Sequence, residues 1–179
     1  MSKLDVKPEN GAEQTNLPAD AVDAIISQWQ NERPDLSLGA MATFGRLKRC
    51  SVLSQPMLDN TFSKFGLSGW EFDVLATLRR SGAPYRLAPT TLFSTLMITS
   101  GTMTHRMKRL ESSGLIERLP NPNDARSMLV QLTDKGLDLI EKAVSAHVNN
   151  MESRLEALDA TQKAKLDEGL KVLLSVLES

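Results

Sequence analysis

The chain has 179 residues, of which 41% are hydrophobic and only 4% aromatic, a size and composition that suit one mainly helical domain with a sizeable core. The single Cys50 excludes an internal disulfide, and two distant histidines leave no zinc cluster. No apolar run reaches the ~20 residues that span a bilayer, and segment 1–14 has no apolar signal-peptide core. We therefore expect a cytoplasmic protein that needs no membrane, metal or cofactor.

The formal charge of −1 hides an uneven distribution. The net charge is −3 over residues 1–78, +5 over 79–126 and −3 over 127–179. A basic middle between acidic flanks is typical of a surface that faces phosphates. Chance clustering of charge is the alternative.

The N-terminal part of the chain predicts two helices after a flexible arm. Residues 1–18 lack apolar periodicity and form the predicted arm. Apolar residues recur at helical spacing over 21–29, until Arg33-Pro34 ends the helix. A longer helical pattern covers 38–64, where Pro56 predicts a kink or break.

The middle of the chain predicts three further helices. Ser68-Gly69-Trp70-Glu71 is a capping box, and the helix that it starts ends at Ser81-Gly82. Pro89 suits the first turn of a helix over 89–96. After a break, Ser100 is the predicted cap of a helix over 100–113.

The remaining sequence predicts a hairpin and two long helices. Short strands over 115–119 and 127–132 flank the turn formers of 120–124. Thr133 is the predicted cap of a helix whose apolar positions continue to Leu158, and the capping box at 159–162 starts the last helix.

The order helix, turn, helix, hairpin predicts a winged helix-turn-helix. The expected fold is mainly α with a small β-hairpin wing, carried on a helical dimerisation scaffold. The predicted parts are an arm over 1–18, dimerisation helices over 19–65, a DNA-binding domain over 66–132 and dimerisation helices over 133–179.

The helix over 100–113 is the candidate DNA-reading element. Hydroxyl groups near its start suit base edges or phosphates, and a helix N-terminus attracts phosphate. An ordinary surface helix with solvated charges is the alternative. Its candidate DNA-binding residues are Ser100, Thr102, Thr104, His105, Arg106, Lys108 and Arg109.

At the hairpin tip, Asp124 lies two residues before Arg126. Such an Asp can hold the guanidinium extended towards a narrow minor groove. A solvated ion pair that contributes little is the alternative.

Several short motifs of the chain are similar to those of a known protein family. They are Trp70-Glu71-Phe72-Asp73-Val74-Leu75, 99–104, Arg109-Leu110-Glu111, Gly114-Leu115-Ile116, Asn123-Asp124-Ala125-Arg126 and Leu132-Thr133-Asp134-Lys135-Gly136. Over residues 36–178 the chain resembles the MarR family of regulators. The resemblance implies an obligate homodimer whose first and last helices interleave, and recognition helices that enter successive major grooves of pseudopalindromic operator DNA. It also implies a functional Asp124 and Arg126 pair in the wing.

Residues 27–36, 72–75, 81–85 and 103–106 resemble the PecS-type, urate-responsive branch of that family. The resemblance implies a ligand pocket made by Trp29, Asp73, Arg106 and Arg118. We expect Asp73 and Arg118 to form a charge pair that an anionic planar ligand disrupts while Trp29 stacks on it. The predicted function is a repressor that urate or a related small aromatic anion releases from DNA.

Other functions remain open from the sequence. The regulator could respond to another aromatic carboxylate or to oxidation of Cys50, although we expect this thiol to be buried and inert. Trp29 and Asp73 could have only structural roles. The winged helix could instead bind a protein. Because no catalytic triad, phosphate loop or metal-ligand spacing is present, we expect no enzyme activity.

Overall fold

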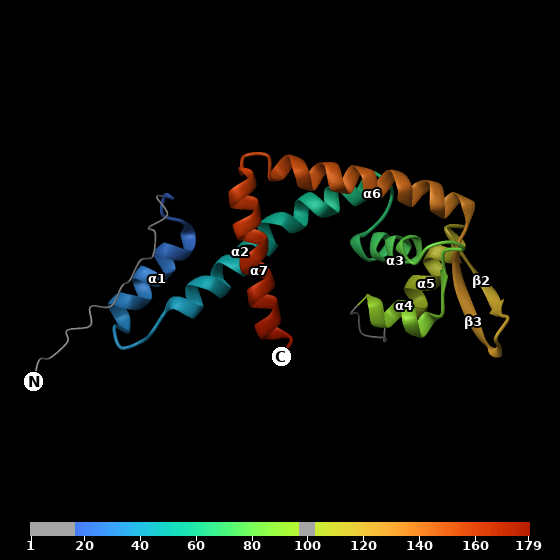
Figure 1. The fold of residues 1–179 in the computed structure, drawn as a ribbon, viewed down its shortest axis with the longest axis horizontal. Coiled ribbons are helices and arrows are strands. Elements are labelled where there is room, and N and C mark those ends of the chain that lie inside the picture. The colour runs from blue at the N-terminus through green and yellow to red at the C-terminus, as the bar shows by residue number, and fades with distance from the viewer. Residues whose placement is uncertain (1–16, 97–102) are drawn as a thin grey trace, which may run out of the picture. The chain divides into compact units, whose positions relative to one another are not determined.

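The structure, a computed structural model, describes residues 17–96 and 103–179 (Figure 1). Two compact units divide inside the second helix, the first ending at Leu53 and the second starting at Ser54. None of the helices in the described ranges is long and apolar enough to cross a membrane. The elements are α1 (Ala21–Glu32), α2 (Gly39–Ser63), α3 (Gly69–Arg80), β1 (Arg86–Leu87), α4 (Pro89–Thr95), α5 (Met103–Ser112), β2 (Ile116–Asn121), β3 (Asp124–Leu132), α6 (Asp134–Arg154) and α7 (Ala160–Leu177).

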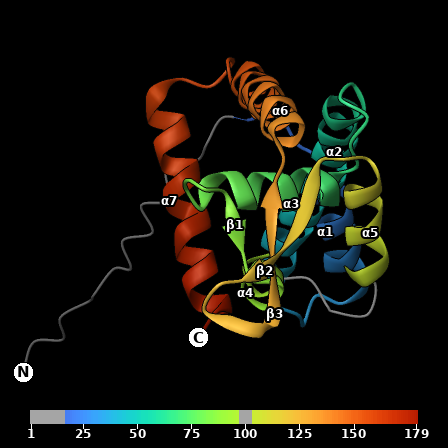
Figure 2. The same ribbon diagram turned by 90° about the vertical axis from the view of Figure 1, so that its right-hand side faces the viewer.

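The predicted fold class, mainly α with a small wing, is confirmed. The wing carries a third strand that the sequence did not predict, because the two residues of β1 are too few to show alternation. The sheet is antiparallel in the order β1-β3-β2 (Figure 2). The predicted break at Pro56 is absent, since α2 continues through it to Ser63. The helix continues because one proline removes only one intrahelical hydrogen bond. Burial of Thr61 and Phe62 stabilises the turn that follows the proline.

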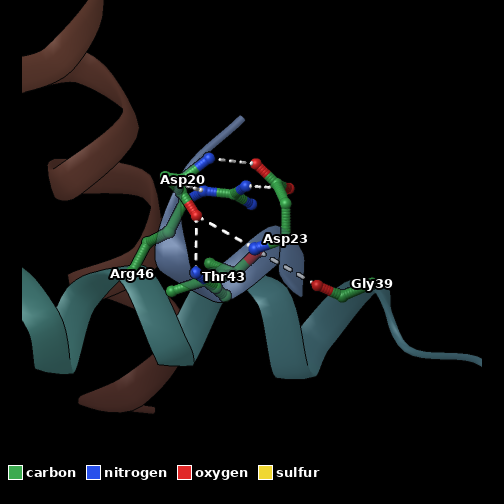
Figure 3. A network of polar contacts seen from close by, with 6 residues as sticks. Asp20, Asp23, Gly39, Thr43 and Arg46 are labelled. Atoms are coloured by element: carbon green, nitrogen blue, oxygen red, sulfur yellow. Dashed lines mark hydrogen bonds and ion pairs between the residues drawn. The ribbon is translucent and has the colours of Figure 1, made fainter. Parts of the chain in front are cut away.

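In the first unit, a polar network joins the start of α1 to α2 (Figure 3). The Asp20 carboxylate accepts hydrogen bonds from the backbone N–H groups of Val22 (2.7 Å) and Asp23 (3.0 Å), which caps α1. The Arg46 guanidinium binds both carboxylates, at 2.7 Å from Asp20. Val22 packs so closely on Gly45 that a Cβ there would lie 3.0 Å from the valine. Charge pairing and close packing thus hold α1 to α2.

The second unit has a hydrophobic core between α3, α4, α5, α6 and the sheet. The inner face of α3 supplies four of its residues, and α5 supplies two, so the core fixes the helix-turn-helix against the wing. The buried core residues are Phe62, Leu67, Phe72, Val74, Leu75, Leu78, Leu92, Met107, Leu110, Leu115, Ile116, Val130, Leu132, Ile140 and Ala143.

A tight junction joins the end of α5, the start of β2 and the start of α6. Thr133 caps α6 as predicted, because its hydroxyl accepts from the Gly136 N–H at 3.0 Å. The same hydroxyl donates to the Gly114 carbonyl at 2.7 Å. Gly136 lies against the backbone of Leu115, and a Cβ on it would be 2.0 Å from the Leu115 carbonyl oxygen. Only glycine fits here without movement of the backbone.

We predict that Gly136→Ala destabilises the protein by about 1–3 kcal/mol, because the new methyl group forces α6 away from Leu115. Gly39→Ala is the matched control, since nothing lies within 4 Å of a Cβ at the first residue of α2. Urea unfolding measures both changes. Equal unfolding midpoints for the two variants would contradict the prediction.

Candidate nucleic-acid interface and ligand site

Helix α5, the candidate recognition helix, has one buried face and one basic face. Met107 and Leu110 are buried in the core of the second unit. Lys108 and Arg109 are exposed, and Arg106 is half-buried. The basic face therefore stays at the surface while the apolar face anchors the helix.

The other predicted residues of this helix are only partly placed. Ser100 and Thr102 lie outside the described residues. Thr104 and His105 belong to α5, but only their backbone is described. Among the described residues Lys108 makes no ion pair, so its ammonium group is open to solvent and to phosphate.

The side chains of Arg109 and Arg106 instead contact residues in the first turn of α3. The Arg109 guanidinium lies 3.0 Å from the Glu71 carboxylate, whose side chain is only 4% exposed. That carboxylate also accepts from the backbone N–H (2.8 Å) and hydroxyl (2.7 Å) of Ser68. The Arg106 guanidinium lies 5.3 Å from the centre of the Trp70 ring, a cation–π contact. The sequence predicted the capping box of Ser68 and Glu71 but not the ion pair between Glu71 and Arg109.

The wing tip corrects one prediction. The Asp124 carboxylate accepts from the backbone N–H of Arg126 at 3.0 Å and does not hold its guanidinium. A short Asp side chain reaches the N–H two residues ahead more easily than the end of a long side chain. Asn121 adds to this turn, because its Oδ1 accepts from the Asn123 N–H at 3.0 Å. The Arg126 side chain is exposed and makes no ion pair with a described residue.

The predicted charge pair between Asp73 and Arg118 is also wrong. The Arg118 guanidinium lies 3.4 Å from Glu111, on the neighbouring helix α5. The charges that act on Asp73 are those of Arg80 and His147. Arg118 therefore links the wing to α5 and not to α3.

Asp73 lines an open cavity between α3 and α4. The cavity has a volume of about 190 Å³ and is lined by Asp73, Thr77, Arg80, Thr95 and Leu96. Partial desolvation raises the pKa of the Asp73 carboxyl, while Arg80 and then His147 act in the opposite direction. Trp29, the fourth residue of the predicted pocket, belongs to the first unit, where its side chain is 44% exposed.

His147 was predicted only as one position of an apolar helix face. Its ring packs against those of Phe62 and Phe72, with ring centres 5.1 and 5.0 Å away, while these two phenylalanines stack on each other at 4.3 Å. Its Nδ1 is buried without a hydrogen-bond partner. Burial lowers the pKa of His147, and the nearby Asp73 carboxylate opposes this shift.

Cys50 is exposed, which contradicts the prediction that it is buried. It lies in the part of α2 that belongs to the first unit, where few side chains are buried. The described residues contain no group of three or more His, Cys, Asp or Glu side chains that could hold a metal ion.

Comparisons with known proteins agree with this geometry. A sequence model of the MarR family matches residues 67–128. The HTH-type transcriptional regulator PecS of Dickeya dadantii is 46% identical over 145 residues, which cover 81% of this chain and 87% of the relative. A mutant MarR of Escherichia coli in complex with operator DNA is 28% identical with a TM-score of 0.61, over 82% of this chain and 97% of that one. A MarR family regulator of Streptomyces coelicolor in complex with DNA has the same fold, with 23% identity and a TM-score of 0.70 over 80% and 91% of the two chains.

We predict that Arg109 positions α5 and does not contact phosphate. Arg109→Ala leaves the buried Glu71 carboxylate without its cation, which should cost about 1–3 kcal/mol of stability. The salt dependence of DNA binding should stay unchanged, whereas Arg126→Ala should lower its slope by about one. Urea unfolding and salt-dependent gel shifts on the DNA upstream of the gene measure both effects. A lower slope for Arg109→Ala would instead show a phosphate contact.

We also predict a loss of stability in weak acid that comes from His147. Since its folded pKa lies below the free value of 6.5, its contribution is complete above that value and is lost as the pH falls through the lowered pKa. Asp73 acts in the opposite direction, because its raised pKa in the folded protein stabilises the fold when this carboxyl group is protonated at acid pH. His147→Leu should therefore reduce the difference in unfolding midpoint between about pH 7.5 and about pH 5.5. An unchanged difference would refute this role.

Proposed function

The chain belongs to the MarR family of transcriptional regulators, and we propose that it binds operator DNA as a homodimer and releases it when a small aromatic anion binds. Urate is the first candidate for that anion. The proposal gives the protein no catalytic role and places it in the cytoplasm, where bacterial DNA lies.

The observation that carries DNA binding is the position of unpaired cations on the helix-turn-helix and wing. Residues 79–126 have a net charge of +5. Within this segment, Lys108 on α5 and Arg126 on β3 are exposed and make no ion pair with another described residue. Free cations on these two elements suit the backbone phosphates that line the major groove and the negative, narrow minor groove. The operator complex of the Escherichia coli relative supports the same use of the fold.

Dimerisation is supported by the terminal helices. None of the residues of α7 is buried, although the helix carries an apolar stripe. We propose that residues 19–65 and 133–179 form the dimer interface and that 66–132 form the DNA-binding domain. The large exposed apolar residues of α7 are Leu166, Leu170, Val172, Leu174, Val176 and Leu177.

Control by an anion is supported by the weakly held arginines of the second unit. Arg118 has one carboxylate partner at 3.4 Å, which an anion could replace. Arg106 rests on Trp70 without an ion pair among the described residues, so an anion that draws it away would shift α5. Asp73 is the third proposed ligand contact, and stacking by Trp29 stays a prediction.

The experiment that tests this function is a gel shift with the DNA upstream of the gene, followed by titration with urate. We expect specific, salt-sensitive binding that millimolar urate abolishes, and weaker release for Arg118→Gln. Lys142→Gln, at an exposed ion pair of α6, is the control. Absence of specific binding at low salt would favour a protein-binding module.

The same gel shift compares two other effectors. Salicylate represents another aromatic carboxylate, and peroxide represents oxidation of Cys50. Cys50 is exposed, so thiol oxidation is a second candidate signal. Release by peroxide that Cys50→Ser prevents, without release by urate, would replace urate with thiol oxidation.

We predict that Leu170→Asp disrupts the dimer, because a carboxylate in the apolar stripe of α7 would have to be desolvated at the interface. Sedimentation velocity should show a dimer for the wild type and a smaller species for the variant. Lys171→Asp is a neighbouring control on an exposed ion pair of the same helix. A monomeric wild type, or equal behaviour of both variants, would contradict the proposed interface.

A further inference from the structure

Helix α5 ends in a left-handed turn that closes its own last hydrogen bonds. Gly114 has a φ of +68°, and its N–H donates to the Glu111 carbonyl at 2.9 Å, while the Leu115 N–H donates to the Leu110 carbonyl at 3.1 Å. These two bonds make a Schellman motif, in which the left-handed position favours glycine. The motif leaves the carbonyls of residues 113–115 without a partner inside α5.

The start of α6 supplies the donors for these three carbonyls. The Thr133 N–H donates to the Leu115 carbonyl at 3.2 Å, and the Thr133 hydroxyl donates to the Gly114 carbonyl at 2.7 Å. The Lys135 ammonium group donates to the Ser113 carbonyl at 2.8 Å. Three consecutive carbonyls after α5 are therefore held by the first residues of α6.

Lys135 differs from its neighbours in this junction because its side chain does nothing else there. Thr133 also caps α6, and Gly136 lies against the Leu115 backbone, so both are needed for the fold itself. Lys135 is exposed and makes no ion pair with a described residue. Its ammonium group lies at the C-terminal end of α5, where a cation interacts favourably with the partial negative charge of the helix.

The two ends that this bond joins flank the wing. Ser113 precedes β2 and Lys135 follows β3, so the bond closes the segment of chain that forms the hairpin. Helix α5 carries the exposed Lys108, and the hairpin carries the exposed Arg126. The bond to Ser113 therefore ties the end of the recognition helix and the base of the wing to the same turn of α6.

We propose that Lys135 is a positioning residue for DNA binding, which caps the C-terminus of α5 and fixes this helix on α6 without touching DNA. The inference rests on the proposed binding of operator DNA. Without the cap, the end of α5 has alternative conformations, and DNA binds only the fraction of molecules in which the helix is correctly placed. Because the free protein can relax into these alternatives, the affinity for DNA falls more than the stability of the fold.

The test is Lys135→Met in the full-length protein, a variant that keeps a long side chain but removes the donor. Its affinity for the DNA upstream of the gene should fall about three- to tenfold. The melting temperature should fall by no more than about 2 °C, since the residue is exposed. The salt dependence of binding should equal that of the wild type, because no phosphate contact is lost. Lys135→Arg restores a charged donor and should recover most of the affinity.

Lys142→Met is the matched control. It removes the same charge from the same helix, but the partner of Lys142 is Asp138, also on α6, so the affinity for DNA should not change. Amide hydrogen exchange measures the cap without DNA. The amides of Gly114 and Leu115 should exchange about three- to tenfold faster in Lys135→Met and at the wild-type rate in the control.

Four results would overturn the inference. A lower salt slope for Lys135→Met would show that the ammonium group contacts phosphate. Unchanged affinity or unchanged amide exchange in this variant would show that the bond to Ser113 does not position α5. A large fall in melting temperature without rescue by Lys135→Arg would make the residue merely structural. These results leave the proposed function intact, whereas no specific binding of DNA by the wild type would refute both.

Discussion

The buried Glu71 carboxylate is the interaction on which the DNA-reading unit depends. It closes the capping box at the start of α3 through Ser68, and it holds Arg109 of α5 at 3.0 Å. A carboxylate that is 4% exposed requires such partners, because an unpaired buried charge is strongly unfavourable. The first turn of α3 therefore adds an ion pair to the buried contacts of Met107 and Leu110 that hold α5.

Helix α3 serves the core with one face and the candidate ligand site with the other. Phe72, Leu75 and Leu78 are buried against the neighbouring helices and the sheet. Asp73, Thr77 and Arg80 line the cavity beside α4. A ligand that contacts Asp73 would bind the same helix whose Glu71 pairs with Arg109 of α5.

The sequence predicted the helix caps well and the pairs between charged side chains poorly. The caps at Asp159 and Thr133 were predicted because each joins residues three positions apart. The pairing of Asp73 with Arg118 was wrong, since a charge pair between separate elements depends on side-chain direction, which periodicity does not give. Of the cavity beside α4, the sequence identified Asp73 but missed the buried Thr77, whose hydroxyl has no partner among the described residues, because its sequence pattern is that of any other helical threonine.

The cations of the basic segment divide into two groups with different consequences for DNA binding. Arg106 and Arg109 are held by Trp70 and Glu71, while Lys108 and Arg126 have no ion pair with a described residue. The salt dependence of binding reports the cations that reach phosphates, not the total charge of the segment. Side chains that position the helix contribute to affinity at every salt concentration, because they reduce the entropy lost on docking. The segment 79–126 has eight cationic side chains, so if Arg106 and Arg109 stay on α3 when DNA binds, at most six of them can contact phosphates.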